Sequence, residues 1–185
     1  EGDAGYAATQ WDLLTQWTDY LVEHGLDPEA PLMTDDFTGM MGHSVNLSAK
    51  SVVAIACDAL LAKMQGRDEI ATRYRAIAED YAGRWQRMAD DGDHSRLAFD
   101  RPGSWGQKYN LAWDTVFGLE LFPREVMRKE LAFYARQRLD YGTPLDSRSP
   151  AAKPEWAIWV ATMADSKEMF EEFIAPIHRY VNETP

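Results

Sequence analysis

Residues 47–64 read LSAKSVVAIACDALLAKM, and this stretch decides the fold. At 3.6 residues per turn its apolar residues point to every side of a helix, so the helix must be covered on more than one face. Lys50 and Asp58 interrupt the run, and both would lie in the hydrocarbon if the segment crossed a membrane. The stretch therefore predicts no membrane span, but a buried helix that the rest of the chain surrounds.

The segments around this helix carry apolar residues three and four positions apart, which predicts further helices packed on it. They cover residues 11–24, 68–89, 107–117, about 123–141, a segment that starts at Pro154, and a last segment capped by Asp165 or Ser166. No segment shows the sustained alternation of a strand. The predicted fold class is all-α, with helical hairpins in a single domain over residues 1–185.

The charge balance narrows the classes of function. The chain carries 19 Lys and Arg against 30 Asp and Glu, and residues 1–49 contain nine acidic residues and no Lys or Arg. Because nucleic-acid binding needs a basic surface, we expect no nucleic-acid partner. The acidic residues of this N-terminal part either form a solvated surface or attract a cation. The single cysteine, Cys57, can form no intrachain disulfide and is expected to be a small core residue.

The sequence contains no self-sufficient catalytic signature, such as a Gly-rich phosphate loop or the motif HExxH. Its histidines, at positions 24, 43, 94 and 178, lack the spacing of metal ligands, and each is expected to be a surface or loop residue. We therefore expect no metal and no cofactor.

Polar clusters in the loops remain as candidates for chemistry. Asp35 and Asp36 are adjacent, and adjacent side chains of an extended chain point in opposite directions, so at most one of them faces a site. One can cap a turn while the other acts as general acid or base. Gln107, Asn110 and Asp114 form one polar stripe beside Trp105. This stripe either binds a small polar molecule or forms a buried hydrogen-bond network between helix and loop.

A third cluster lies in the Pro-bounded loop around Ser147. Asp146 and Arg148 can form an ion pair that pins the loop, or Arg148 can clamp a substrate carboxylate. Trp156 follows near the start of the next predicted helix, and a tryptophan there can stack on a ligand. The remaining tryptophans of apolar stripes are expected in the core: Trp11, Trp17, Trp85 and Trp159.

These clusters carry a family resemblance. The segments concerned are DDFTG (35–39), NLSAK (46–50), SWGQKYNL (104–111), GL (118–119), LFP (121–123), FY (133–134), YGTPLDSR (141–148) and NETP (182–185). Together they resemble the central helical domain of the glutaminase A family of secreted fungal and bacterial proteins. The resemblance implies an (α/α)6 toroid of six helical hairpins, of which this chain would be part. It also implies a secreted, periplasmic or cell-surface location and hydrolysis of L-glutamine to glutamate and ammonia.

Three hypotheses follow for function. In the first, the chain is part of a glutaminase-like amidohydrolase acting on a small polar substrate, in which Asp35 or Asp36 and Asp114 activate water, and Lys108 or Arg148 holds the substrate carboxylate. Further substrate-binding candidates are Asn46, Lys50, Trp105, Asn110 and Trp156. The second is a glycoside-processing toroid with two carboxylates and tryptophan platforms. The third is a non-catalytic structural or binding domain of a larger enzyme.

The lengths of the connections predict where the site lies. The first, third and fifth connections between the predicted helices are long, and alternate connections of an up-and-down bundle fall at the same end. Asp36, Asn46, Trp105, Lys108 and Arg148 are therefore expected on one rim. Because part of a toroid lacks its closing neighbours, we also expect contact with the remaining domains of the parent chain. The same apolar edge favours self-association and is expected at Trp11, Trp17, Phe170 and Phe173.

Overall fold

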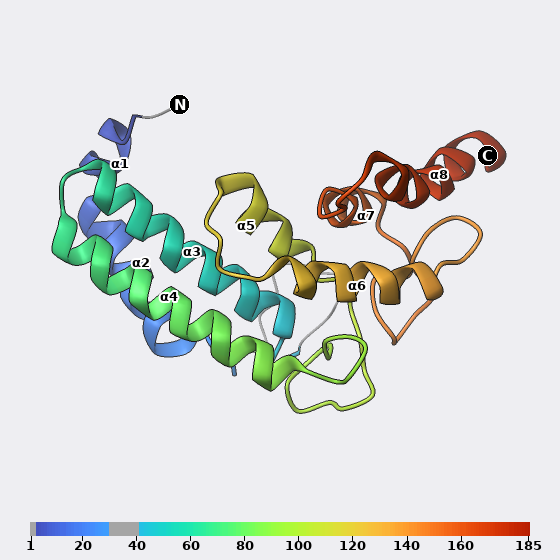
Figure 1. The fold of residues 1–185 in the computed structure, drawn as a ribbon, viewed down its shortest axis with the longest axis horizontal. Helices are drawn as coiled ribbons and strands as arrows, with labels where there is room; N and C mark the ends of the chain where they lie inside the picture. Colours follow the sequence, from blue (N-terminus) through green and yellow to red (C-terminus); the bar gives the residue numbers. More distant parts are fainter. Residues whose placement is uncertain (1–2, 30–40) are drawn as a thin grey trace.

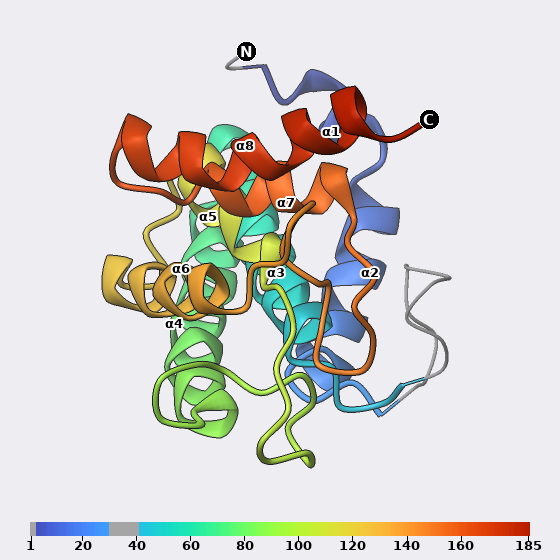
Figure 2. The same cartoon turned by 90° about the vertical axis from the view of Figure 1, so that its right-hand side faces the viewer.

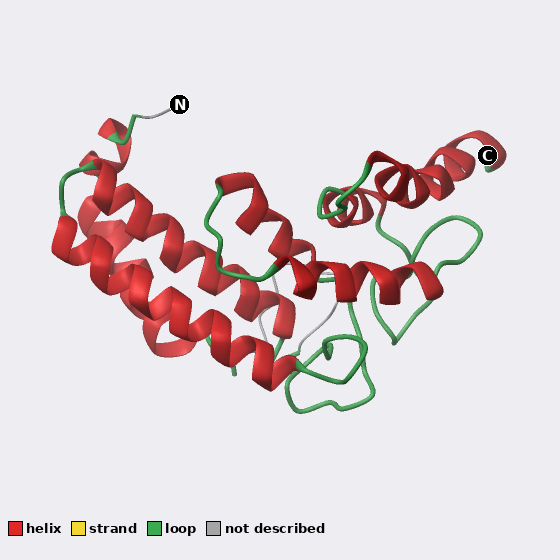
Figure 3. Ribbon diagram, viewed as in Figure 1, coloured by secondary structure: helices red, strands yellow, loops and turns green. Residues whose placement is uncertain are grey.

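The computed structural model describes residues 3–29 and 41–185, and this part of the chain is all-α, as predicted (Figures 1 and 3). The elements are α1 (Gly5–Thr9), α2 (Trp11–His24), α3 (Val45–Met64), α4 (Asp68–Ala89), the 3-10 helix η2 (Tyr109–Leu111), α5 (Ala112–Phe117), α6 (Arg124–Arg136), α7 (Pro154–Ala161) and α8 (Lys167–Glu183). Within the described ranges, β pairing is limited to isolated bridges between loops.

The long helices α2, α3 and α4 pack side by side at one end of the molecule, and α7 and α8 lie at the other, with α6 between them (Figure 1). Helix α3 contacts α2, α4, α5 and η2, which explains why it is apolar on every side. Its N-terminus is capped by Ser44, whose hydroxyl accepts a hydrogen bond from the Leu47 amide. The indole of Trp85 on α4 donates to the Val45 carbonyl at 2.8 Å and fixes the two helices together.

Helix α3 is buried along most of its length but not at its end. Val52 and Ile55 are fully buried, whereas Leu60 is 45 % exposed, so the prediction that the rest of the chain surrounds the whole helix is wrong at its C-terminal end. Among the described residues α3 is the helix long and apolar enough to cross a membrane, and 67 % of its apolar window is buried inside the protein. Burial of α3 by the neighbouring helices therefore accounts for its apolar composition.

Three element boundaries differ from the predictions. Residues 107–108 are not helical, because the Gln107 amide donates to the Leu145 carbonyl at 2.8 Å instead of joining a helix. Helix α6 ends at Arg136 rather than near residue 141, where Leu139 and Tyr141 are exposed and offer no core to extend it. The short helix α1 was not expected, and none of its residues is buried.

The exposed aromatic residues also correct two predictions. Trp11 and Trp85 are in the core, but Trp17 is 58 % and Trp159 37 % exposed. Of the four residues expected to form an apolar edge, Trp11 and Phe173 are buried and Phe170 is half-buried. Arg67 covers the Trp11 ring at 4.4 Å, and α7 packs on α8, so these four residues do not form one exposed patch.

The long connections meet at one end of the molecule, as predicted (Figure 2). The Val45 amide donates to the Leu97 carbonyl at 3.1 Å, which joins the first connection to the third. The Ser147 amide donates to the Trp105 carbonyl at 2.9 Å, which joins the third to the fifth. We call the segments 41–46, 94–99, 104–110 and 143–148 the loop junction. Asp36, also expected here, lies outside the described residues.

Candidate functional site

The loop junction encloses a small pocket lined mainly by buried side chains. Asn46, Lys108 and Asp146 line it, together with Met41, Ser44, Leu97, Gly106, Gln107, Tyr109 and Leu145. Its volume of about 20 Å³ is enough for one water molecule but not for an amino acid. The pocket itself is therefore too small to hold an amino-acid substrate.

Asn46 and Asn110 bind each other. The Asn46 Oδ1 atom accepts from the Asn110 amide at 3.2 Å, and Asn110 Nδ2 donates to the Asn46 carbonyl at 3.1 Å. Both residues are buried, and their contacts join the start of α3 to η2. Gln107 donates in the same way to the carbonyls of Thr143 and Pro144. The structure thus supports the hydrogen-bond-network interpretation of the polar stripe.

Lys108 is fully buried, which its charge did not suggest. Its Nζ atom donates to the Gly106 carbonyl at 2.6 Å and to the Ser95 carbonyl at 3.2 Å. Burial lowers the pKa of this ammonium group to about 8. A side chain held in this way fixes two loop segments, so Lys108 is not placed to hold a substrate carboxylate.

Tyr134 and Glu130 on α6 complete the support of Lys108, and sequence reasoning missed both. The Tyr134 hydroxyl accepts from the Lys108 amide at 2.9 Å and lies 2.5 Å from Glu130 Oε2. Glu130 is fully buried, and its other oxygen has no hydrogen-bond partner. The signal in the sequence was an acidic residue on the apolar face of a helix, between Met127 and Leu131.

Replacing Tyr134 with Phe is expected to lower the free energy of unfolding by about 1–3 kcal/mol, because the Lys108 amide and Glu130 lose a buried partner. Urea denaturation measures this, with Tyr141→Phe as the control at an exposed tyrosine. Equal stabilities for the two variants would show that the Tyr134 hydroxyl does not hold the junction.

Arg148 is fixed by Asp146 in a two-pronged ion pair. Asp146 Oδ1 accepts from Arg148 Nε at 2.9 Å and Oδ2 accepts from Nη2 at 2.6 Å, while the Arg148 amide also donates to Oδ1. The hydrogen bonds to Asp146 raise the pKa of the guanidinium, which stays charged. The Arg148 side chain is 34 % exposed and that of Asp146 6 %. The pair therefore pins the loop and still presents part of a cation at the surface.

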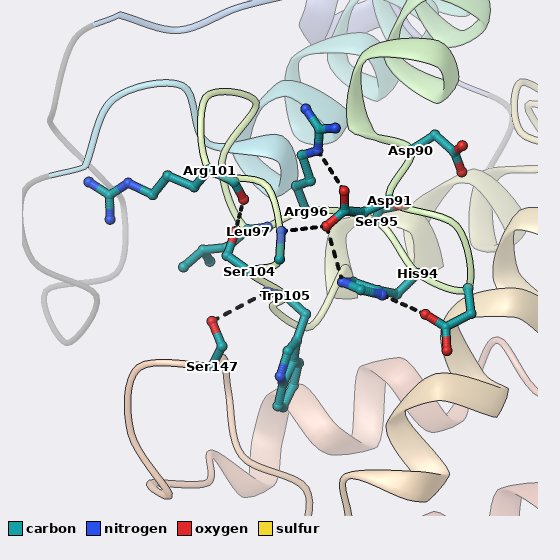
Figure 4. A network of polar contacts seen from close by, with 12 residues as sticks. Asp90, Asp91, His94, Ser95, Arg96, Leu97, Arg101, Ser104, Trp105 and Ser147 are labelled. Atoms are coloured by element: carbon teal, nitrogen blue, oxygen red, sulfur yellow. Dashed lines mark hydrogen bonds and ion pairs between the residues drawn. The ribbon is translucent and has the colours of Figure 1, made fainter.

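Trp105 lies at the edge of the junction, on a loop that a second network holds (Figure 4). Its amide lies 3.3 Å from Ser147 Oγ, and its ring is half-buried against Phe133. Asp91 organises the loop by accepting from the Gly103 amide at 2.6 Å and from Arg96 Nε at 3.1 Å. The Gly103 bond is the main reason that the pKa of the Asp91 carboxyl is lowered.

His94 supports the same loop from inside. Its ring stacks on Phe133 at 4.2 Å, with Asp93 2.8 Å from Nδ1 and Asp91 3.7 Å from Nε2 (Figure 4). His94 lies in a loop, one of the two placements expected for the histidines, and it is buried there. Among the described residues no group of three or more His, Cys, Asp or Glu could hold a metal. Cys57 is partly buried against the core, and burial raises the pKa of its thiol to about 11.

The other described residues predicted for the site do not present side chains to a ligand at the loop junction. Trp156 is buried with its ring stacked on Tyr109 at 4.8 Å, so it supports the pocket wall instead of offering an exposed platform. Lys50 is exposed on α3 and does not line the pocket. Asp114 accepts from the amides of Leu121 and Phe122 and thus stabilises a different turn. Asp35 and Asp36 lie outside the described residues.

Comparisons with known proteins agree with this architecture. Residues 1–185 match the family described as the glutaminase A six helical-hairpin domain. Glutaminase A of Aspergillus oryzae is 33 % identical over 189 residues, which cover 99 % of this chain and 27 % of that protein. A probable glutaminase of Arthroderma benhamiae is 29 % identical over 98 % of this chain and 25 % of its own length.

The chain thus spans about a quarter of the length of these relatives. The match extends over every element described above, including all the segments that meet at the loop junction. The chain belongs to the glutaminase A six helical-hairpin domain family.

Proposed function

We propose that this chain is part of a glutaminase-like amidohydrolase that converts L-glutamine to L-glutamate and ammonia. The observation that carries the proposal is the partly exposed guanidinium of Arg148, which Asp146 holds rigidly at the loop junction. A guanidinium carries five N–H donors in one plane, and its charge-assisted hydrogen bonds to carboxylate oxygens are strong. In this proposal Arg148 binds the α-carboxylate of glutamine. The names of the two relatives support glutamine as the substrate.

Amide hydrolysis needs a base, because water must lose a proton as its oxygen adds to the amide carbon and ammonia leaves with that proton. Asp114 is not available for this step, since both of its oxygens accept backbone amides. The proposal therefore assigns the base to Asp35 or Asp36, the pair predicted from the sequence. Lys108, Tyr134 and Asn46 hold the junction in place in this scheme.

The proposal also includes a role for the other domains of the parent protein. The relatives are about four times as long as this chain, so we infer that further domains of the parent contribute to substrate binding. The family resemblance supports a secreted, periplasmic or cell-surface location.

A glycoside-processing site is the second candidate, and the described residues favour it less. Such a site needs two available carboxylates and an exposed aromatic platform. At the junction Asp146 is committed to Arg148, and the Trp156 ring is covered by Tyr109.

Incubating the full-length parent with glutamine, asparagine and a panel of glycosides distinguishes the two candidates. We expect ammonia release from glutamine and no reducing sugar. Reducing sugar without ammonia would replace the amidohydrolase proposal with the glycosidase, and activity on none of the substrates would favour a non-catalytic domain.

A further inference from the structure

A buried carboxyl group without an ion-pair partner lies away from the loop junction, where α2 packs on α3. Asp58 sits in the middle of α3 and is 4 % exposed. Neither of its oxygens accepts a hydrogen bond of normal geometry, and the Thr18 hydroxyl is a weak partner that lowers its pKa. Among residues 3–29 and 41–185, no Lys, Arg or His forms an ion pair with it. An ionised carboxylate in such a place is strongly destabilising, so the group must gain a proton or leave its surroundings.

The groups that face Asp58 come from both neighbouring helices. Helix α2 contributes the buried Thr18 and the carboxylate of Asp19, and α4 contributes Tyr74. Asp19 is already engaged, because its Oδ1 accepts from the Tyr74 hydroxyl at 2.9 Å and lies 3.5 Å from Arg73. The Asp19 carboxylate therefore adds negative charge near Asp58 and does not compensate the charge of an ionised Asp58.

Helix α2 buries few of its own residues. Its buried residues are Trp11 and Thr18, and Leu13, Trp17 and Tyr20 are exposed. The Thr15 hydroxyl on the same helix is buried without a hydrogen-bond partner. Few apolar contacts and unsatisfied polar atoms are typical of an element that opens at low cost.

We propose that Asp58 is a protonation switch that controls the docking of α2: the neutral acid lets α2 pack on α3 and α4, and the ionised carboxylate releases it. Burial is the main cause of a raised Asp58 pKa; the Thr18 hydroxyl lowers it and the Asp19 carboxylate raises it further. The folded state therefore keeps the proton at a pH where the open state has lost it. Docking is strongest below the ordinary Asp pKa of about 3.9 and weakens as pH rises to the folded value, with no further change above it.

Hydrogen exchange of the 185-residue chain between pH 4 and pH 8 tests the switch without any substitution. Protection factors, corrected for the intrinsic effect of pH, are expected to fall for α2 amides by up to about tenfold per pH unit within the window, while those of α8 stay constant. Protection of α2 that does not depend on pH would overturn the proposal.

Asp58→Asn provides the matched variant, because it removes the titration and keeps the shape. We expect the pH dependence of α2 protection to vanish in Asp58→Asn and to persist in Asp19→Asn, which changes the exposed carboxylate of the same interface. The same pH dependence in Asp58→Asn as in the unsubstituted chain would contradict the assignment to Asp58. Stabilisation by added Ca²⁺ that is lost in Asp58→Asn would also overturn it, since a cation and not a proton would then compensate the charge.

Discussion

Arg148→Ala in the full-length parent is expected to reduce kcat/KM for glutamine about 100-fold or more. The reason is that a charge-assisted contact to the substrate carboxylate is lost, which costs about 2–5 kcal/mol at a buried pair. Arg148 is a cation that the structure both fixes and partly exposes at the loop junction. Steady-state ammonia release at varied glutamine concentration measures the effect.

Two further variants separate substrate binding from folding. Arg148→Lys keeps the positive charge but loses the fork, so its activity should fall between those of the unsubstituted protein and Arg148→Ala. Arg128→Ala removes an exposed arginine that pairs with Asp165 and should leave activity unchanged. A loss of less than about threefold for Arg148→Ala would remove Arg148 from the proposed site.

Ile55→Ala is expected to lower the free energy of unfolding by about 2–5 kcal/mol, because helices on several sides of α3 prevent the cavity from collapsing. Ile55 is fully buried in the main core. Urea denaturation with a two-state fit gives the value.

Leu60→Ala on the same helix is the control. Its side chain is 45 % exposed, so the loss should stay below about 1 kcal/mol. Similar losses of unfolding free energy in Ile55→Ala and Leu60→Ala would contradict the burial of Ile55 and the exposure of Leu60.

Periodicity and capping predicted most of the fold from the sequence. Helix α4 ends at Ala89 as predicted, and Asp68, predicted as its N-cap, is its first residue. Ser166 caps α8 by accepting from the Met169 amide at 3.1 Å. The clustering of the long connections followed from their alternation along the chain. The helix after Gly106 starts later than predicted. Its late start could not be read from the sequence, because the amides of Gln107 and Lys108 donate to the distant residues Leu145 and Tyr134.

The chemistry of individual side chains was harder to predict. Lysine is rarely buried, so nothing local marks Lys108 as a buried link that depends on Tyr134 from another helix. Trp17 shares an apolar stripe with Trp11, yet it is exposed because α2 lies at the side of the molecule, outside α3 (Figure 2). Asp146 and Arg148 were paired correctly from their spacing, since a two-residue separation allows the contact within one loop.

The most direct measurement of the central claim is a structure of the full-length parent with the product L-glutamate bound. We expect the α-carboxylate of glutamate on the Arg148 guanidinium, at the rim where the three long connections meet. Glutamate bound away from this rim, with no contact to Arg148, would contradict the proposed site.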